Sequence, residues 1–153
     1  MDKPKLIEKL NEAISLELGA VLQYNQYAQV VLGEARKIWR DFFEDSSEEA
    51  MKHARKFGER VVALGGTPSV EPQPVKQTND LQEMLENSLA VERRAVEVYT
   101  EALSFCEDNP AYRNMLEEQI FDEQKDVEEI EMYLNKVQKV AAAPQSRQAG
   151  MTA

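Results

Sequence analysis

The chain has 153 residues, of which 30% are charged and 42% hydrophobic, and its formal net charge is −10. This length suits one domain with a buried core, and the composition is that of a folded protein rather than a disordered one. The excess of acid, 28 acidic against 18 basic residues, excludes nucleic acid and anionic membranes as favoured partners and attracts cations.

The first predicted helix runs from about residue 4 to residue 32. Pro4 suits the first turn of a helix, and Gly33 offers a left-handed stop. Glu17 lies at a core position of this helix, because it interrupts an apolar stripe that advances in steps of three and four residues. The stripe consists of Ile7, Leu10, Ile14, Glu17, Val21, Tyr24, Ala28 and Val31.

A second helix is expected from about residue 35 to residue 64, ending at Gly65-Gly66. It carries His53, the only histidine of the chain. Residues 67–79 contain three prolines and no helical pattern, so we expect an extended connection. At about 3 Å per residue, such a segment can cross most of the length of a long helix.

Two further helices follow this connection. Asp80 is expected to cap a helix that runs to about residue 107, and Asn109-Pro110 opens another that runs to about residue 140. The predicted fold class is all-α: a four-helix bundle over residues 1–140, built from two antiparallel helical hairpins joined by a long crossover. Residues 141–153 are small and polar, and we expect a disordered tail there.

The first and third helices carry the same sequence frame. Residues 17–24 read E-x-x-A-V-x-x-Y, and residues 92–99 read the same. This spacing puts a carboxylate and a tyrosine on one otherwise apolar helical face. Because an uncompensated buried charge is costly, Glu17 and Glu92 must be neutralised, paired or bound to a cation. Two such carboxylates in equivalent places predict a shared cation.

Each candidate ligand also has a structural interpretation. A single Glu in a helical stripe is more often exposed or salt-bridged, and a single His is more often structural than a ligand. Glu123 and Asp126, three residues apart on the fourth helix, lie in an acidic run that also suits a solvated face. The internal repeat favours the functional interpretation, because it places His53 opposite Asp126.

Together these residues would surround a central cavity with oxygen and nitrogen donors from all four helices. Cys106 is the only cysteine, which excludes a thiolate cluster built by this chain alone. Such a donor set suits two divalent ions, with iron or manganese as the leading metals and zinc as an alternative.

Four signatures resemble the ferritin-like superfamily, and specifically bacterioferritins: Glu17, residues 51–54 (Met-Lys-His-Ala), Glu92 and residues 122–124 (Asp-Glu-Gln). The resemblance implies a carboxylate-bridged di-iron centre that oxidises Fe(II) with dioxygen or peroxide, in iron storage or detoxification. It also implies that Glu17, His53, Glu92 and Glu123 are metal ligands. Tyr24 matches a tyrosine beside the family's metal centre, with a role as electron or hydrogen-bond donor.

Two positions depart from the family's pattern of Glu-x-x-His on the second and fourth helices. Ala50 stands three residues before His53, and Asp126 stands three residues after Glu123. Glu49 is the predicted replacement for the first missing carboxylate, because residues four apart also share a helical face. The resulting ligand set, Glu17, Glu49, His53, Glu92, Glu123 and Asp126, is harder than the family's.

The resemblance also bears on haem and assembly. Met51 falls where bacterioferritins place a haem ligand between two subunits, although an apolar interface contact is the simpler interpretation. The last thirteen residues do not resemble the family's fifth helix, which helps to close a cage of subunits in bacterioferritins. We therefore expect a homodimer or a larger homo-oligomer, and the sequence does not predict the cage. No apolar run is long enough for a membrane span and no signal-peptide core is present, so we expect a cytoplasmic protein without a membrane partner.

Three functions fit this pattern. The leading one is a di-iron oxidoreductase, a candidate ferroxidase. The second is a non-catalytic metal-binding or degenerate bundle with a storage or assembly role, which Ala50 and Asp126 favour. The third is a di-iron oxygenase acting on an organic substrate, for which the shared site is the only support.

Overall fold

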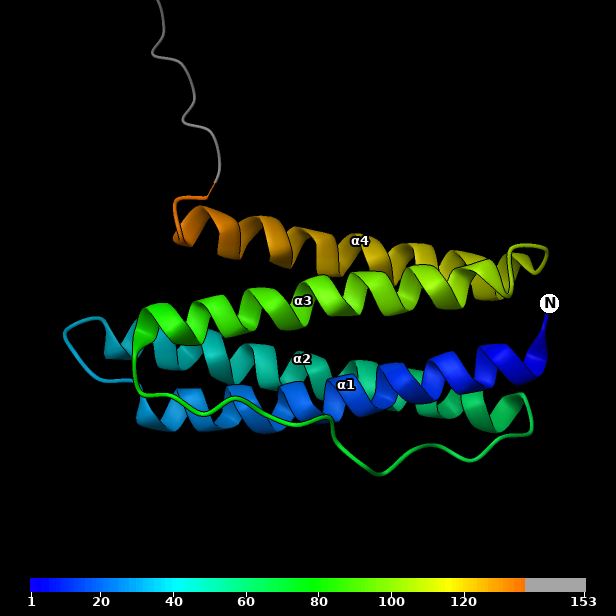
Figure 1. The fold of residues 1–153 in the computed structure, drawn as a ribbon, viewed down its shortest axis with the longest axis horizontal. Helices are drawn as coiled ribbons and strands as arrows, with labels where there is room; N and C mark the ends of the chain where they lie inside the picture. The colour runs from blue at the N-terminus through cyan, green and yellow to red at the C-terminus, as the bar shows by residue number, and fades with distance from the viewer. Residues whose placement is uncertain (137–153) are drawn as a thin grey trace, which may run out of the picture.

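The structure is a computed structural model that describes residues 1–136. These residues form four helices: α1 (Lys3–Val30), α2 (Arg36–Ala63), α3 (Leu81–Ser104) and α4 (Pro110–Tyr133). Figure 1 shows α1 and α2 as one antiparallel hairpin and α3 and α4 as a second. The predicted all-α four-helix bundle is confirmed. Among the described residues, no helix combines the length and hydropathy needed to cross a bilayer.

Local side chains define the helix ends. Asp80 accepts a hydrogen bond from the backbone N–H of Glu83 at 2.8 Å, and the Asn109 side chain accepts from two N–H groups of the first turn of α4. α4 ends at Tyr133 rather than near residue 140, since Asn135 adopts a left-handed backbone with φ 54°. The predicted tail, residues 141–153, lies outside the described residues.

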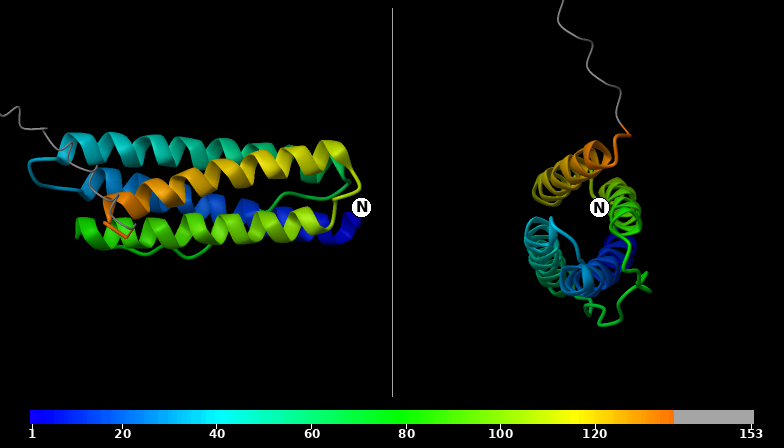
Figure 2. Two further views of the ribbon diagram at one scale, coloured as in Figure 1. Left: turned by 90° about the horizontal axis from the view of Figure 1, so that it is seen from above. Right: turned by 90° about the vertical axis from the view of Figure 1, so that its left-hand side faces the viewer.

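The long crossover between the hairpins runs along α1 (Figures 1 and 2). The Gln73 N–H donates to the Ser15 carbonyl at 2.8 Å, and the Lys76 N–H donates to the Gln23 side chain at 2.9 Å. Gly19 permits this close approach, because a Cβ at that position would lie 2.8 Å from the Gln73 carbonyl oxygen. The predicted extended connection is confirmed, and it closes the outer face of α1.

The apolar core is divided into two clusters along the bundle. One contains Leu10, Phe57 and Leu116, and the other contains Tyr27, Phe43 and Met84. Three buried carboxylates occupy the helix positions between the clusters: Glu17, Glu92 and Glu123. The fold therefore encloses a polar layer of carboxylates between two apolar clusters.

The four helices do not approach one another equally. α1 packs against α2 and α3, and α3 packs against α4, whereas α2 and α4 make no comparably close approach within the described residues. The end-on view in Figure 2 shows the four helices arranged as a ring, with α2 and α4 on the same side.

Candidate metal centre

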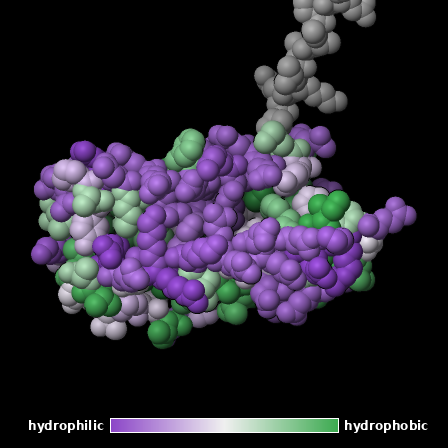
Figure 3. Space-filling view, turned by 180° about the vertical axis from the view of Figure 1, so that it is seen from behind, coloured by the Kyte–Doolittle hydropathy of each residue, from purple (hydrophilic) through white to green (hydrophobic). Residues whose placement is uncertain are grey.

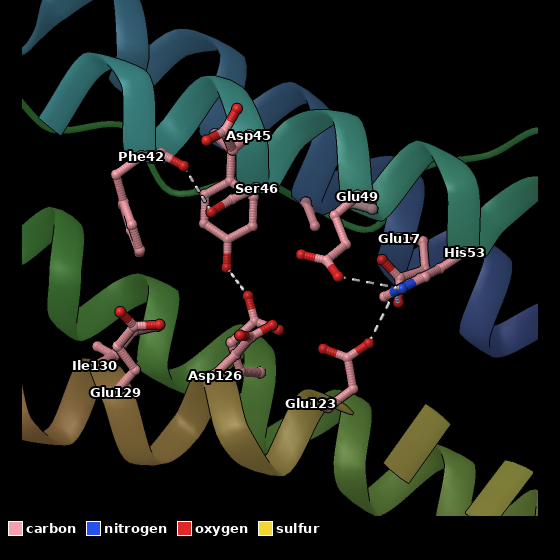
Figure 4. Close-up of a pocket in the computed structure, with 14 residues that line it drawn as sticks. Glu17, Phe42, Asp45, Ser46, Glu49, His53, Glu123, Asp126, Glu129 and Ile130 are labelled. Carbon is pink, nitrogen blue, oxygen red and sulfur yellow. Dashed lines mark hydrogen bonds and ion pairs between the residues drawn. The ribbon is translucent and has the colours of Figure 1, made fainter. Parts of the chain in front are cut away.

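A pocket of about 180 Å³ lies at the polar layer, between α2 and α4 (Figure 4). All four helices contribute to its wall. The lining residues are Glu17, Ala20, Tyr24, Phe42, Asp45, Ser46, Glu49, Ala50, His53, Glu92, Glu123, Asp126, Glu129 and Ile130. Every predicted site residue except Met51 is among them, so the structure brings the predicted ligands and Tyr24 together at one pocket.

The two repeated frames bond to each other across the bundle. The Tyr24 hydroxyl donates to Glu92, and the Tyr99 hydroxyl donates to Glu17. α1 and α3 run antiparallel, so a tyrosine two turns after one glutamate lies opposite the glutamate of the other helix. Each tyrosine therefore orients the carboxylate of the opposite frame. The sequence revealed the repeat but gave no role to Tyr99.

His53 joins two of these carboxylates on one side of the pocket. Its Nδ1 atom lies 2.9 Å from Glu123 Oε1 and 3.5 Å from Glu17 Oε1, and its side chain is 12% exposed. Within the described residues, Glu17, His53 and Glu123 form a set whose donor atoms all lie within 4.8 Å of one another. We refer to this set as the imidazole group.

A second set meets the same criterion with oxygen donors alone. It consists of Glu92, Glu123 and Asp126, and we refer to it as the carboxylate group. Glu123 belongs to both sets, because its side chain lies between His53 of α2 and Glu92 of α3. Two neighbouring three-donor sites with a shared carboxylate are the arrangement expected for a dinuclear metal centre.

Glu49 and Met51 stand apart from these two sets. Glu49 lies 4.0 Å from His53 Nε2, the nitrogen on the opposite side of the ring from Glu17 and Glu123, and its side chain is 51% exposed. It lines the pocket but belongs to neither donor group. Met51 is partly buried on α2 and does not line the pocket. Both ligand roles stay predictions.

Burial dominates the electrostatics of the site. It raises the pKa of Glu17 to about 7, against the lowering effect of the hydrogen bond from His53. It also raises the pKa of Glu92 well above the usual range, and the neighbouring Glu123 adds to that shift. The pKa of Asp126 rises to about 7, through burial and then through repulsion from Glu92 and Glu49. These carboxyl groups therefore keep their protons to a higher pH than exposed carboxyl groups do, unless a cation replaces the protons.

The pKa of the His53 imidazole is set by its neighbours rather than by burial. Burial alone would lower its pKa, but hydrogen bonds to Glu123 and Glu17 outweigh burial and raise the pKa to about 10. Among the residues that the structure describes, His53 is the one basic side chain that lines the pocket, against four carboxylates in the two donor groups. This excess of negative charge, together with oxygen and imidazole donors, fits divalent ions such as iron or manganese.

Gln119 supports the site, although it was not among the residues predicted from the sequence. The side chain is 2% exposed, and its amide nitrogen lies 2.8 Å from His53 Nε2 and 3.3 Å from Glu123 Oε1. Its amide oxygen accepts a hydrogen bond from Lys56 at 3.1 Å. The usable signal was its spacing, because a residue four before Glu123 shares the inward face of α4. Gln119 thus holds the ring of His53 on the side away from the donors.

The chain matches known proteins over most of its length. The ferritin-like domain matches residues 7–140 of the chain. Bacterioferritin of Brucella melitensis is 30% identical over 143 residues, which cover 90% of this chain and 88% of the relative. The resemblance inferred from the four sequence signatures is therefore confirmed.

Two solved structures share the fold. A ferritin-like di-iron carboxylate protein of Bacillus anthracis str. Ames is 34% identical with a TM-score of 0.85, over 88% of this chain and 99% of that one. Rhodobacter capsulatus bacterioferritin, described with a metal-free dinuclear site and haem iron, is 29% identical with a TM-score of 0.77, over 87% and 85% of the two chains. Sequence, fold and site geometry agree that this chain belongs to the ferritin-like family, as a relative of the bacterioferritins.

Proposed function

We propose that this chain, an iron-binding member of the ferritin-like family, oxidises Fe(II) at its two donor groups with dioxygen or peroxide, in iron storage or detoxification. One observation carries the proposal: four carboxylates and one imidazole, drawn from all four helices, converge on one pocket. Within residues 1–136, His53 is the only basic side chain in its wall. Such a cluster is stable at neutral pH only when cations or protons balance it.

The proposed ligands are Glu17, His53, Glu92, Glu123 and Asp126. Glu123 would contact both ions, since it belongs to both donor groups. Tyr24 and Tyr99 hold the carboxylates of Glu92 and Glu17, and Gln119 holds His53, so the donors are oriented before metal arrives. Tyr24, which lines the pocket, is also a candidate to supply a proton or an electron.

Two Fe(II) ions at these positions would each give one electron to the oxidant. The chain's contribution is to hold the ions close together and to release protons when they bind. The apolar clusters on either side of the polar layer exclude bulk water from both ends, so the pocket between α2 and α4 is the route to the site. Its acidic lining suits the passage of cations.

Stopped-flow absorbance of Fe(II) mixed with dioxygen or peroxide tests the proposal. The initial rate should exceed that of buffer, rise to about two iron ions per chain and then fall as the sites fill. Asp126→His, which restores an imidazole to the carboxylate group, should increase the rate. An oxidation rate no higher than buffer in the parent, with a clear gain in Asp126→His, would instead support the alternative of a non-catalytic binder or degenerate bundle.

The metal identity and haem content have a direct test. Metal analysis of protein purified without added metal separates iron from manganese and zinc, and a Soret band would reveal haem. Haem at Met51 between two copies of the chain is a separate proposal, supported by the haem described in the Rhodobacter capsulatus relative. Met51→Leu should abolish a Soret band if Met51 ligates haem, and leave iron at the dinuclear site unchanged.

A further inference from the structure

One end of the bundle contains a run of aromatic rings that begins at the proposed metal site. The ring of Tyr24 stacks on Phe43 with 6.3 Å between centroids, and Phe43 lies 6.4 Å from Trp39. Trp39 in turn lies 5.2 Å from Tyr133 of α4. Each step is within the roughly 4.5–7 Å between the centroids of aromatic rings in contact. We refer to these four residues as the aromatic path.

The aromatic path connects the buried site to the surface. Tyr24 is 2% exposed and its hydroxyl donates to Glu92, a proposed ligand, whereas Tyr133 is 42% exposed. Trp39 and Tyr133 also line a second pocket, of about 520 Å³, at the end of the bundle where α4 ends. Seen from behind, the molecule is mostly hydrophilic, with hydrophobic residues visible where the surface is hollowed (Figure 3). A small water-soluble molecule can therefore reach the outer end of the path.

The equivalent tyrosine of the other repeat has no such connection. Tyr99 bonds to the carboxylate of the opposite frame, as Tyr24 does. Its ring pairs with Phe57 at 4.9 Å, and within residues 1–136 no further aromatic pair continues from Phe57. Phenylalanine gives up an electron far less readily than tyrosine or tryptophan does. Of two tyrosines that the repeat places alike, Tyr24 alone leads to oxidisable side chains at the surface.

The outer end of the path has a proton acceptor beside its last ring. The Tyr133 hydroxyl donates to Glu129 Oε1 at 2.6 Å, and this hydrogen bond raises the pKa of Tyr133 to about 12. The phenol therefore keeps its proton at neutral pH and releases it only when it loses an electron. Because Glu129 can take that proton, oxidation of Tyr133 gives a neutral radical rather than a charged one.

Protein electrons are needed whenever peroxide meets a site that holds one iron ion. Hydrogen peroxide takes up two electrons and two protons to give two water molecules, and each Fe(II) ion supplies one electron. Two Fe(II) ions supply both electrons, but with one Fe(II) ion the second electron must come from a side chain. Oxidation of a ligand would damage the site, whereas Tyr133 belongs to neither donor group.

We propose that the aromatic path carries this second electron from Tyr133 to the metal site. Trp39 and Tyr24 each give up and regain one electron in turn, and Phe43 bridges them. As the electron leaves, Tyr133 passes its proton to Glu129. An external phenol then restores Tyr133 by donating one hydrogen atom, and Glu129 releases its proton to solvent. The inference rests on the proposed function, because peroxide must oxidise iron at the site.

Freeze-quenched EPR spectroscopy tests the path. Protein with one Fe(II) ion per chain, mixed with hydrogen peroxide, should form a tyrosyl radical, which ring-deuterated tyrosine identifies by its narrowed signal. With two Fe(II) ions per chain, the radical yield should fall several-fold, because iron then supplies both electrons. Hydroquinone, a neutral phenol, should remove the signal, because Tyr133 is exposed.

Conservative variants locate the radical. Tyr133→Phe keeps the ring but has no hydroxyl to oxidise, so the tyrosyl signal should fall several-fold and a tryptophanyl signal should replace it. Trp39 is the only tryptophan, so that signal is unambiguous. Trp39→Phe interrupts the path, so the radical should stay at Tyr24 and resist hydroquinone. Tyr112→Phe is the matched control, because Tyr112 lies in the first turn of α4, and it should leave the radical yield unchanged.

The possible failures are distinguishable. Iron oxidation no faster than in buffer would refute the proposed function. Normal iron oxidation without a tyrosyl radical at one Fe(II) ion per chain, or equal tyrosyl yields in the parent and Tyr133→Phe, would refute only the aromatic path. Glu129→Gln gives a second test that keeps every ring in place. It removes the proton acceptor of Tyr133 and should slow radical formation several-fold, and an unchanged rate would overturn the proposal.

Discussion

The imidazole group and the carboxylate group share Glu123 but differ in how their charge is balanced. In the imidazole group, His53 forms ion pairs with Glu17 and Glu123, and its pKa is raised to about 10. In the carboxylate group, the third donor is Asp126, whose pKa is raised to about 7 by burial and by its acidic neighbours. One group therefore contains its own counter-charge, whereas the other depends on protons or a cation.

The difference arises within two nearly equivalent hairpins. His53 and Asp126 occupy matching positions on α2 and α4, and each lies opposite a frame with the same E-x-x-A-V-x-x-Y pattern. Equivalent backbone positions have thus acquired different donors. Because imidazole binds iron and manganese well while a lone carboxylate is a harder ligand, we expect a tighter ion in the imidazole group and a weaker one in the carboxylate group.

Removal of one anchor from each group should have the largest effect. In the double variant Glu17→Gln, Glu92→Gln, the amide oxygens still accept from Tyr99 and Tyr24, but the anionic ligands are lost. At free metal about 100 times Kd, the parent should gain about 2.7 kcal/mol of stability, and the double variant should gain none. Thermal unfolding with and without Mn(II) measures this gain.

The matched control is Glu8→Gln, Glu86→Gln, which changes exposed residues on the same two helices and should keep the full gain. Without metal, the Glu17→Gln, Glu92→Gln protein should be at least as stable as the parent, because two desolvated carboxylates are removed. A parent-like response to Mn(II) in that variant would exclude both groups as the metal site.

Single-ligand variants separate the two groups. His53→Ala should weaken the tighter ion by at least about tenfold, because it removes the only imidazole. Asp126→Ala should weaken only the second ion and leave the first binding step unchanged. Titration against a coloured chelator resolves the two steps, and equal losses in both variants would mean that the groups do not differ as their donors suggest.

The fold was predictable from the sequence because its signals are local. Each signal depends on residues that are close together in the sequence. The signals are the apolar stripe through Glu17, with its steps of three and four residues, the caps at Asp80 and Asn109, and the prolines of residues 67–79. The end of α4 was not predictable, because the apolar pattern in the sequence continues to Val137, whereas α4 ends at Tyr133 and Asn135 has a left-handed backbone.

The site was predictable only in part, since long-range geometry decides it. The repeat identified Glu17 and Glu92, but the bonds from Tyr99 and Tyr24 depend on the antiparallel register of α1 and α3. The role of Gln119 depends on His53 of the other hairpin. The pocket depends on the separation of α2 and α4, and sequence periodicity carries no signal for that distance.

The two groups also predict how the metal-free protein responds to pH. The pKa of Glu17 rises from its ordinary 4.5 to about 7 on folding, so its stabilising contribution is complete below about pH 4.5 and is lost as pH rises through about 7. The raised pKa of Asp126 acts in the same direction over a similar range. For His53, the contribution is complete below pH 6.5 and is lost progressively as pH rises from there through about 10.

Between pH 5 and pH 8, metal-free protein should therefore lose stability, by about 2–3 kcal/mol from Glu17 alone. Metal-loaded protein should gain stability over the same range, because metal displaces fewer protons as pH rises. Urea unfolding at several pH values measures both slopes. Glu17→Gln should flatten the metal-free slope, and an unchanged slope in that variant would show that Glu17 does not hold a proton at neutral pH.

The smallest effect is expected from Glu49, the one predicted ligand that lies outside both groups. Its side chain is half-exposed and reaches only the outer nitrogen of His53, so Glu49→Ala should change metal affinity by less than about threefold. Ala50→Glu should instead tighten the weaker ion, because it adds a buried carboxylate on the inward face of α2. Chelator titration of both variants compares adjacent positions on one helix. If Glu49→Ala weakened binding as strongly as His53→Ala, Glu49 would have to swing inward on metal binding, and the imidazole group would contain four donors rather than three.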